Sequence, residues 1–167
     1  MPTYHRLTRA GLLLSVMLLI QSARLFMPIP PFISLFVIGS AVNACLLLAV
    51  EQSGWRLALV LAVIAPIIAY FQQVLLLPLF IIPVAAANAA YVLGYRLSAA
   101  LGRWPSVGIA TLTKAGALYV LVDWLISWLH LPGNLAAIMS AMFGWPQLIT
   151  GLGGGILCFL VLRRTMR

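Results

Sequence analysis

The sequence predicts an all-α integral membrane protein: a six-transmembrane-helix bundle in a single domain, 1–167, with a short outer helix before the last span. Three observations support this fold class. Hydrophobic residues make up 64% of the chain and charged residues 7%, whereas soluble domains carry about 25% charged residues. Apolar runs recur along the chain, each close to the roughly 20 residues that cross about 30 Å of hydrocarbon. The runs are continuous rather than alternating, which indicates helices and not a β-barrel.

The first apolar run resembles a signal peptide, because Arg6 and Arg9 precede its apolar core. No small-residue cleavage site follows it and further apolar runs do, so we expect it to be retained as a helix. Together, the apolar runs and the breakers between them predict six spans, at 7–26, 33–50, 56–72, 84–101, 107–129 and 145–163.

The basic residues predict the orientation of the spans. If the N-terminus is inside, the outer segments hold Arg24 alone, and Lys114 lies within a span. This asymmetry predicts a multi-pass protein of the bacterial cell (plasma) membrane with both termini in the cytoplasm. The net charge of +8 then indicates contact with anionic membrane lipid and no binding of nucleic acid. The inner segments hold Arg6, Arg9, Arg56, Arg96, Arg103, Arg163, Arg164 and Arg167.

A short helix is predicted between the fifth and sixth spans. Pro132 and Gly133 break the fifth helix, and Asn134 is a suitable N-cap for a helix over about 135–142. We expect this helix to lie near the outer membrane surface.

The sixth span begins within "GWPQLITGLGGG" (144–155), an apolar stretch that contains helix-weakening residues. Gly144 suits the position after the short helix, and Pro146 suits the first turn of the next helix, where its missing N–H would be unpaired anyway. Gly151 and Gly155 form a small-xxx-small pair, which predicts close approach of another helix.

The outer connections are apolar, rich in proline and almost free of charge. Loop one, between the first and second spans, is "MPIPPFI" (27–33), and loop three, between the third and fourth spans, is "VLLLPLFIIPV" (74–84). Either these loops fold back over the mouth of the bundle and form the apolar rim of a small-molecule site, or they rest in the membrane interface. Both interpretations remain open from the sequence.

The fifth span carries a polar stripe that we expect to face the bundle interior in the outer half of the membrane. One interpretation is a ligand-binding face; the other is an internal ion pair between Asp123 and Arg24, and the two are compatible. Lys114 is nine residues from Asp123, which puts it on the opposite face. The stripe consists of Tyr119, Asp123, Ser127 and His130.

Lys114 has two interpretations. Its side chain either extends to the cytoplasmic headgroups or packs locally, or it contacts a ligand or an asparagine. Asn43 and Asn88 lie near the middle of the membrane, and interhelical hydrogen bonding is their expected role. Asn88 shares a helix face with Tyr91 and Tyr95.

Polar and aromatic side chains gather toward the outer side, which predicts a ligand pocket there under loops one and three. We expect Trp128 and Trp145 to form apolar walls, although both also suit an interfacial aromatic belt. The residues expected to bind the ligand are Gln21, Asp123, Ser127, Trp128, Trp145 and Gln147.

The sequence does not predict an enzyme. It lacks HExxH, GxSxG and GxxxxGK[ST] motifs and has two histidines and two acidic residues. His130 and Asp123 alone are too few ligands for a metal site. We therefore expect no catalytic residues, no metal and no cofactor.

Four stretches together resemble the substrate-binding (S) components of energy-coupling factor (ECF) vitamin transporters. They are "MPIPPFISLFVIGSAVNACLLLA" (27–49), "IIPVAAANAAYVLGYRL" (81–97), "LTKAGALYVLV" (112–122) and "FGWPQLITGLGGGILCFLVLRR" (143–164). Members of this family bind a micronutrient in a pocket open to the outside and associate with a transmembrane coupling protein and two ATPase subunits. The resemblance implies a vitamin-sized small-molecule substrate and ATP-driven uptake by those partners.

The resemblance also implies a partner-binding face on the first helix, where family members carry alanines at four-residue spacing. The matching positions here are Gly11 and Ser15, with Ser22 further along the same face. The other interpretation of these small residues is an ordinary packing face.

A different function class fits the same spans: a non-transporting six-span scaffold protein of a cell-shape or envelope complex. Such a protein would show no water-accessible outer pocket and no dependence on ATPase partners. The identity and charge of a ligand, the partner of Asp123 and the role of Lys114 stay open from the sequence.

Overall fold

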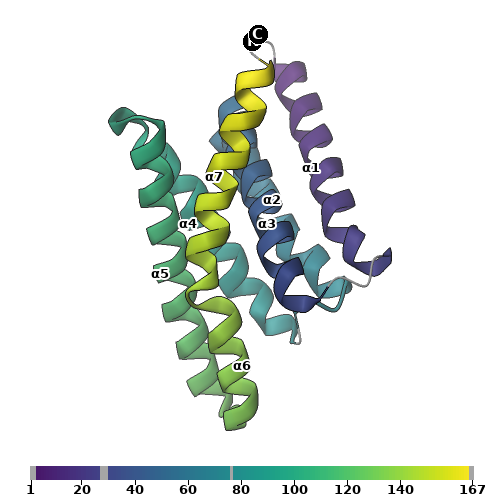
Figure 1. Cartoon of the computed structure of the whole chain (residues 1–167), viewed down its shortest axis with the longest axis vertical. Helices are drawn as coiled ribbons and strands as arrows, with labels where there is room; N and C mark the ends of the chain where they lie inside the picture. Colours follow the sequence, from purple (N-terminus) through teal and green to yellow (C-terminus); the bar gives the residue numbers. More distant parts are fainter. Residues whose placement is uncertain (1–2, 27–29, 76, 166–167) are drawn as a thin grey trace.

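The computed structural model describes residues 3–26, 30–75 and 77–165 (Figure 1). Every element in this described part is a helix. In chain order they are α1 (Thr3–Phe26), α2 (Pro31–Gln52), α3 (Trp55–Phe71), η1 (Pro78–Phe80), α4 (Ile81–Leu97), η2 (Ala99–Leu101), α5 (Arg103–Leu129), α6 (Gly133–Phe143) and α7 (Pro146–Thr165).

Five stretches of the described chain are helical, long enough and apolar enough to cross a membrane, and α3 is a shorter apolar helix of 17 residues. The chain is therefore an all-α, multi-pass membrane protein, as its composition predicts. The five stretches are Tyr4–Phe26, Phe32–Gln52, Pro78–Leu97, Arg103–Leu129 and Gly133–Arg164, the last of which contains both α6 and α7.

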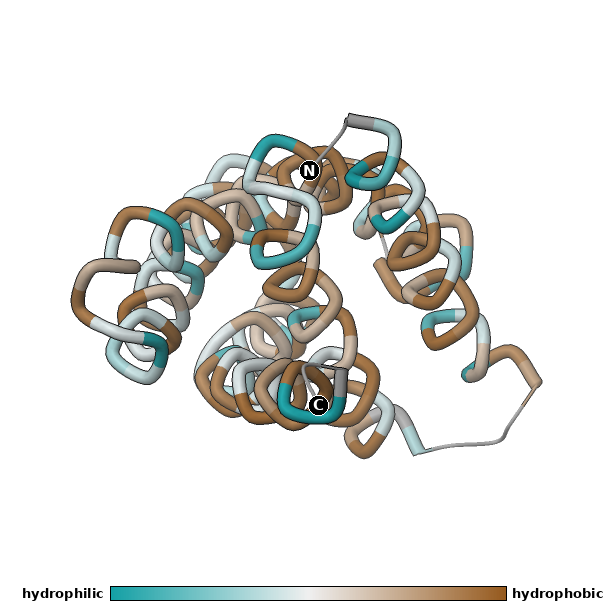
Figure 2. Tube along the Cα trace, turned by 90° about the horizontal axis from the view of Figure 1, so that it is seen from above, coloured by the Kyte–Doolittle hydropathy of each residue, from teal (hydrophilic) through white to brown (hydrophobic). Residues whose placement is uncertain are grey.

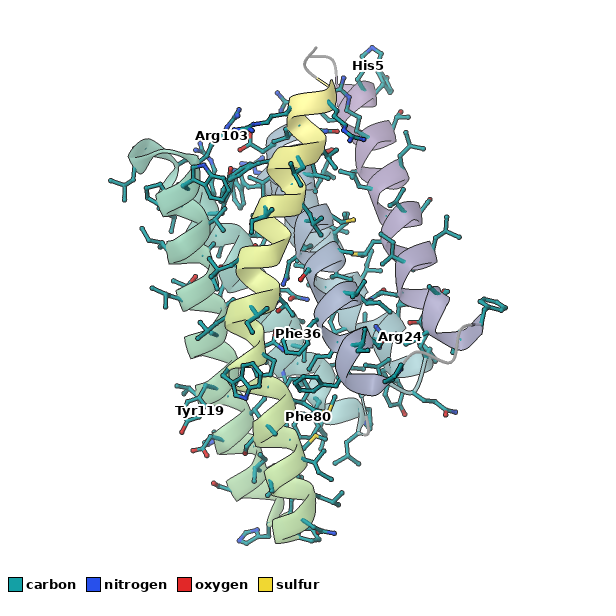
Figure 3. The ribbon with its side chains drawn as sticks, viewed as in Figure 1. His5, Arg24, Phe36, Phe80, Arg103 and Tyr119 are labelled. Carbon is teal, nitrogen blue, oxygen red and sulfur yellow. The ribbon has the colours of Figure 1, made fainter. Side chains whose placement is uncertain are left out.

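The long helices run side by side, and α1 begins and α7 ends at the same end of the bundle, the terminal end (Figure 1). His5 and Arg103 lie at this terminal end, whereas Arg24, Phe80 and Tyr119 lie in the half away from it (Figure 3). Viewed from the terminal end, hydrophobic residues are distributed over all the helices (Figure 2), and many large apolar side chains are exposed, such as Leu19 on α1. An apolar exterior of this kind suits contact with lipid.

The break between α6 and α7 confirms that the last apolar region is two elements and not one bent helix. The short helix spans Gly133–Phe143, and α7 begins at Pro146, the residue predicted to start it. The predicted N-cap is wrong: Pro132, not Asn134, occupies that position. The ring of Pro132 fixes φ at −54°, ψ is extended at 142°, and the helix begins two residues before the predicted start. Asn134 Oδ1 instead accepts a hydrogen bond from the Leu135 N–H.

Two glycines of α7 permit close packing against α5, as their four-residue spacing predicts. A Cβ added at Gly151 would lie 2.7 Å from the side chain of Thr111, and one added at Gly155 would collide with Val107. The carbonyl oxygen of Gly151 also accepts a hydrogen bond of 2.7 Å from Tyr91 Oη of α4.

The other two glycines of α7 pack against α2, a contact that the sequence did not predict. A Cβ at Gly153 would lie 2.6 Å from Ser40 Oγ, and one at Gly154 would lie 2.5 Å from Asn43 Cβ. The α2–α7 interface is the most extensive helix pair in the described structure. The run GLGGG therefore lets one helix lie tightly between two others.

We predict that Gly154→Ala destabilises the protein although alanine is the better helix former. The added methyl group has no room beside Asn43, and overpacking of this kind typically costs about 1–3 kcal/mol. The matched control is Gly116→Ala on α5, where no atom lies within 4 Å of the new Cβ; it should be neutral or stabilising by up to about 1 kcal/mol. Thermal unfolding of the purified protein in detergent measures both, and equal midpoints for the two variants would contradict the packing described here.

Candidate functional site

A cavity of about 120 Å³ lies among the helices. Residues from all seven α-helices and from the segment between α3 and η1 line it. Most of the wall is apolar, including Leu35, Ile38 and Val42 of α2. The polar and charged side chains at the cavity are Gln21, Arg24, Asn43, Asn88, Lys114, Gln147 and Thr150.

Lys114 is the most unusual of these residues because its side chain is buried at 5% exposure in an apolar bundle. Its Nζ donates hydrogen bonds to Asn43 Oδ1 at 2.5 Å and to Asn88 Oδ1 at 2.9 Å. The same nitrogen lies 5.4 Å from the centroid of the Tyr91 ring, within the range of a cation–π interaction. Two carbonyl oxygens and a ring face thus replace part of the water that an ammonium group loses on burial.

Pro66 orients the amide of Asn88. Proline has no backbone N–H, so the carbonyl of Ala62, four residues earlier in α3, loses its helical donor. Asn88 Nδ2 lies 3.4 Å from that carbonyl oxygen and donates a hydrogen bond to it. Because the NH₂ group faces α3, the amide oxygen is directed toward Lys114.

Two buried polar atoms at the cavity have no hydrogen-bond partner within the described part of the chain. Gln21 Nε2 donates to the Ala65 carbonyl at 3.2 Å, and this leaves Gln21 Oε1 without a donor. Asn43 Oδ1 is used by Lys114, and Asn43 Nδ2 is left without an acceptor. Both atoms are buried and belong to residues that line the cavity, and buried polar groups without a protein partner are typically satisfied by bound water or a ligand.

The remaining polar groups are held in place by backbone carbonyls. Arg24 Nε donates to the Gln21 carbonyl at 3.2 Å, which places the guanidinium at the cavity, and Gln147 Nε2 donates to the Met142 carbonyl at 3.3 Å. Phe143, which also lines the cavity, stacks on Phe80 with ring centroids 5.7 Å apart.

The structure brings Gln21 and Gln147 of the predicted site together at this cavity. Trp145 is 56% exposed and packs against Phe32 and Phe36 of α2, with ring centroids 6.2 and 5.8 Å away. Of the two loops expected to cover the site, loop three contributes Val74 and Leu75 to the lining. Loop one includes residues 27–29, which lie outside the described residues.

The other predicted site residues lie outside the cavity. Asp123 lines a separate small pocket between α5 and α6, Ser127 Oγ donates to the Asp123 carbonyl at 3.0 Å, and Trp128 stacks on Trp124. Arg24 lies at the cavity rather than in the pocket of Asp123. A role in ligand binding stays a prediction for Asp123, Ser127 and Trp128.

The prediction that the polar stripe of the fifth span faces the interior is wrong, because all its members are exposed: Tyr119, Asp123, Ser127 and His130. The face of α5 that packs into the bundle is a neighbouring one, formed by Ser106, Val107, Ala110, Thr111, Lys114, Leu118, Val122 and Leu125. Polar side chains near a helix end are accommodated by the membrane interface, so they do not identify the buried face.

Asn43, Asn88 and Lys114 form the polar base of the cavity, which the sequence alone did not assign to the site. The predicted interhelical hydrogen bonding of the two asparagines is confirmed, and the contact with asparagine is the interpretation of Lys114 that the structure supports. The sequence did offer one indication of this role. A polar side chain near the middle of a membrane costs free energy, so its presence there indicates a functional site or a polar partner.

Within the described residues, no cluster of three or more His, Cys, Asp or Glu side chains is placed to hold a metal ion. Searches of protein-family models, curated proteins and solved structures gave no match to the chain. The class of the protein therefore follows from its own fold and cavity: a multi-pass helical membrane protein with a compact, polar-based cavity.

We predict strong coupling between Lys114 and Asn88. Asn88→Leu removes one acceptor from a buried ammonium and should reduce the free energy of unfolding by about 1.5–3 kcal/mol. In a Lys114→Met background the same change should cost much less, since no charge remains to be solvated. Thermal or denaturant unfolding of the four proteins in detergent gives the coupling energy.

The control for this cycle is Asn134→Leu, an equivalent change at an exposed residue of α6. Its effect should add to that of Lys114→Met. Additive effects for Asn88→Leu as well would show that the Lys114–Asn88 hydrogen bond contributes nothing to stability.

Proposed function

We propose that the protein is the substrate-specific membrane subunit of an ATP-driven uptake system of the ECF type. In this role it binds a vitamin-sized micronutrient in an outward-facing pocket, and partner subunits supply the energy. The observation that carries the proposal is the cavity with buried Lys114 at its base and unpaired Gln21 Oε1 and Asn43 Nδ2 beside it.

The polar lining favours a binding site over a packing defect. Each buried polar atom without a partner costs about 1–3 kcal/mol, and an apolar residue at position 21 would avoid that cost at Gln21 Oε1. A cavity of about 120 Å³ is small beside the roughly 300–1,000 Å³ of pockets for drug-sized ligands. It therefore suits a compact ligand, or the polar end of a larger one whose remainder lies toward loop three.

The proposed orientation follows from the distribution of charge. Arg103 lies at the end of the bundle where α1 begins and α7 ends, and Arg24 lies in the opposite half (Figure 3). Arg163 and Arg164 are in the last turn of α7, and Arg6 at the start of α1 shares a surface pocket with Arg56. With positive residues inside, the cavity faces outward. In the proposed topology α3, the predicted third span, also crosses the membrane and brings the number of spans to six, because 17 helical residues extend about 26 Å and cross a slightly thinned bilayer.

The ATP-driven step requires partners because the chain has no GxxxxGK[ST] motif. We propose a transmembrane coupling protein and two ATPase subunits, with the coupling protein on α1. Gly11 is exposed, with no atom within 4 Å of an added Cβ, and Ser15 Oγ bonds back to the Gly11 carbonyl at 3.0 Å. Ser22 accepts a hydrogen bond from Gln72 Nε2 at 3.0 Å, so the proposed contact face is centred on Gly11 and Ser15.

The proposed function predicts that the protein purified from cells retains a small molecule, which mass spectrometry of the denatured sample detects. Gln147→Ala should lower the amount retained, because Gln147 lines the cavity. Gly116→Ala, an exposed change on α5, should leave the amount unchanged. If no small molecule is retained and the growth phenotype of a deletion is a change in cell shape, the scaffold function is favoured instead.

We also predict that Gly11→Leu combined with Ser15→Leu abolishes complex formation and uptake while ligand retention persists. The two isobutyl groups would keep a partner helix at a distance, because close helix approach in membranes requires small residues. Co-purification with the ATPase subunits and cellular uptake are the readouts, and Gly116→Leu serves as the control for an added bulky side chain on an exposed helix face. Normal uptake by the double variant would place the coupling face elsewhere.

A further inference from the structure

We infer that the cavity selects a small organic anion, a monocarboxylate bound between Lys114 and Arg24. The inference rests on the proposed function, because it names the substrate class of the same cavity. Two cationic side chains, Lys114 of α5 and Arg24 of α1, line the same largely apolar cavity. None of the described residues that line this cavity is acidic.

Neither of the two acidic residues of the chain lines this cavity. Glu51, at the last turn of α2, accepts a hydrogen bond of 2.5 Å from Tyr95 Oη. Asp123 lines the separate pocket with Tyr119, Val122, Ser140 and Phe143. The described lining of the cavity thus holds two positive side chains and no negative one. A bound anion would stabilise a positive charge in such an apolar environment.

The hydrogen-bonding capacity at the base fits a carboxylate. An ammonium group has three N–H donors, and Lys114 directs hydrogen bonds to two amide oxygens, which leaves one donor for a ligand. Asn43 Nδ2, without an acceptor in the described chain, belongs to the amide that holds Lys114. One ammonium N–H and one amide N–H match the two oxygens of a carboxylate, whereas a phosphate group presents three strong acceptor oxygens and more charge.

The remaining lining defines the rest of the ligand. Gln21 Oε1 lacks a donor within the described chain, so the ligand should also carry one N–H or O–H group. Leu35, Ile38 and Val42 provide an apolar wall on α2, which suits an aliphatic or aromatic body. Arg24 Nε is held by the Gln21 carbonyl, and this brings the second cation to the cavity beside that acceptor.

The test compares acids with neutral molecules of the same shape. Pentanoate, benzoate and 4-hydroxyphenylacetate are each paired with the corresponding primary amide and added to the purified protein in detergent at constant ionic strength. Thermal unfolding is the readout, since a ligand that binds the folded state raises the unfolding midpoint. The expected result is that at least one acid raises the midpoint and its amide does not. Equal stabilisation by acid and amide, or no stabilisation by any acid, would overturn the inference.

Three variants test the assignment of the cations. Lys114→Met should abolish stabilisation by the acid, and Arg24→Gln should weaken the binding of the acid by about tenfold or more. Arg103→Gln, which removes an arginine at the terminal end of the bundle (Figure 3), should bind the acid as the unchanged protein does. Arg24→Gln keeps the experiment decisive if Lys114→Met does not fold. Unchanged affinity in Arg24→Gln would remove Arg24 from the site.

Failure of this inference and failure of the proposed function give different results. Retention of a neutral or cationic small molecule by the purified protein would support the proposed function and overturn the anion selectivity. Acid-selective binding in a protein whose uptake needs no ATPase partner would support the anion selectivity and overturn the proposed function.

Discussion

The hydrogen bonds of Lys114 to Asn43 and Asn88 are the constraint on which the rest of the structure depends. An ammonium group in the apolar interior is tolerated only where oxygen atoms replace lost water, and here the two oxygens come from α2 and α4. Asn88 is in turn oriented by the Ala62 carbonyl, which Pro66 leaves without a helical donor. One charge on α5 therefore fixes the relative positions of α2, α4 and α3.

The glycines of α7 allow this helix to pack closely against the residues that surround Lys114. Gly154 packs against Asn43, so a side chain at 154 would displace the residue that holds Lys114. Gly151 packs against α5 near Thr111, and its carbonyl accepts the hydrogen bond of Tyr91, whose ring lies beside the ammonium group. Helix packing in membranes relies on small residues rather than on hydrophobic exclusion, and in this chain the same small residues support the base of the cavity.

The sequence predicted those features of the fold that depend on composition and local backbone chemistry. Apolar run lengths gave the helices, and Pro146 with Gly144 gave the separation of α6 from α7. The buried face of α5 was not predicted because Asp123 and Ser127 lie toward a helix end, where the membrane interface accommodates polar side chains, so their stripe does not identify the buried side. The base of the site depends on hydrogen bonds of Lys114 to Asn43 and Asn88, which are 71 and 26 residues away in the sequence. No local sequence pattern specifies such pairs.

Helix α1 connects the two functional features of the proposed transporter. Its buried side is narrow and includes Ala10, Met17 and Gln21, and much of the rest of the helix is exposed. Gly11 and Ser15 lie on the exposed side, while Gln21 and Arg24, about two to three turns further along, line the cavity. A partner helix bound at Gly11 would therefore act on a helix that carries one free acceptor and one cation of the site. Displacement of α1 from α2 and α3 would remove the Gln21 acceptor and the Arg24 cation from the bound ligand while Lys114 stays fixed by its asparagines. In the proposed transporter, ligand release would then need no rearrangement of the tightly packed α2–α7 and α4–α5 pairs.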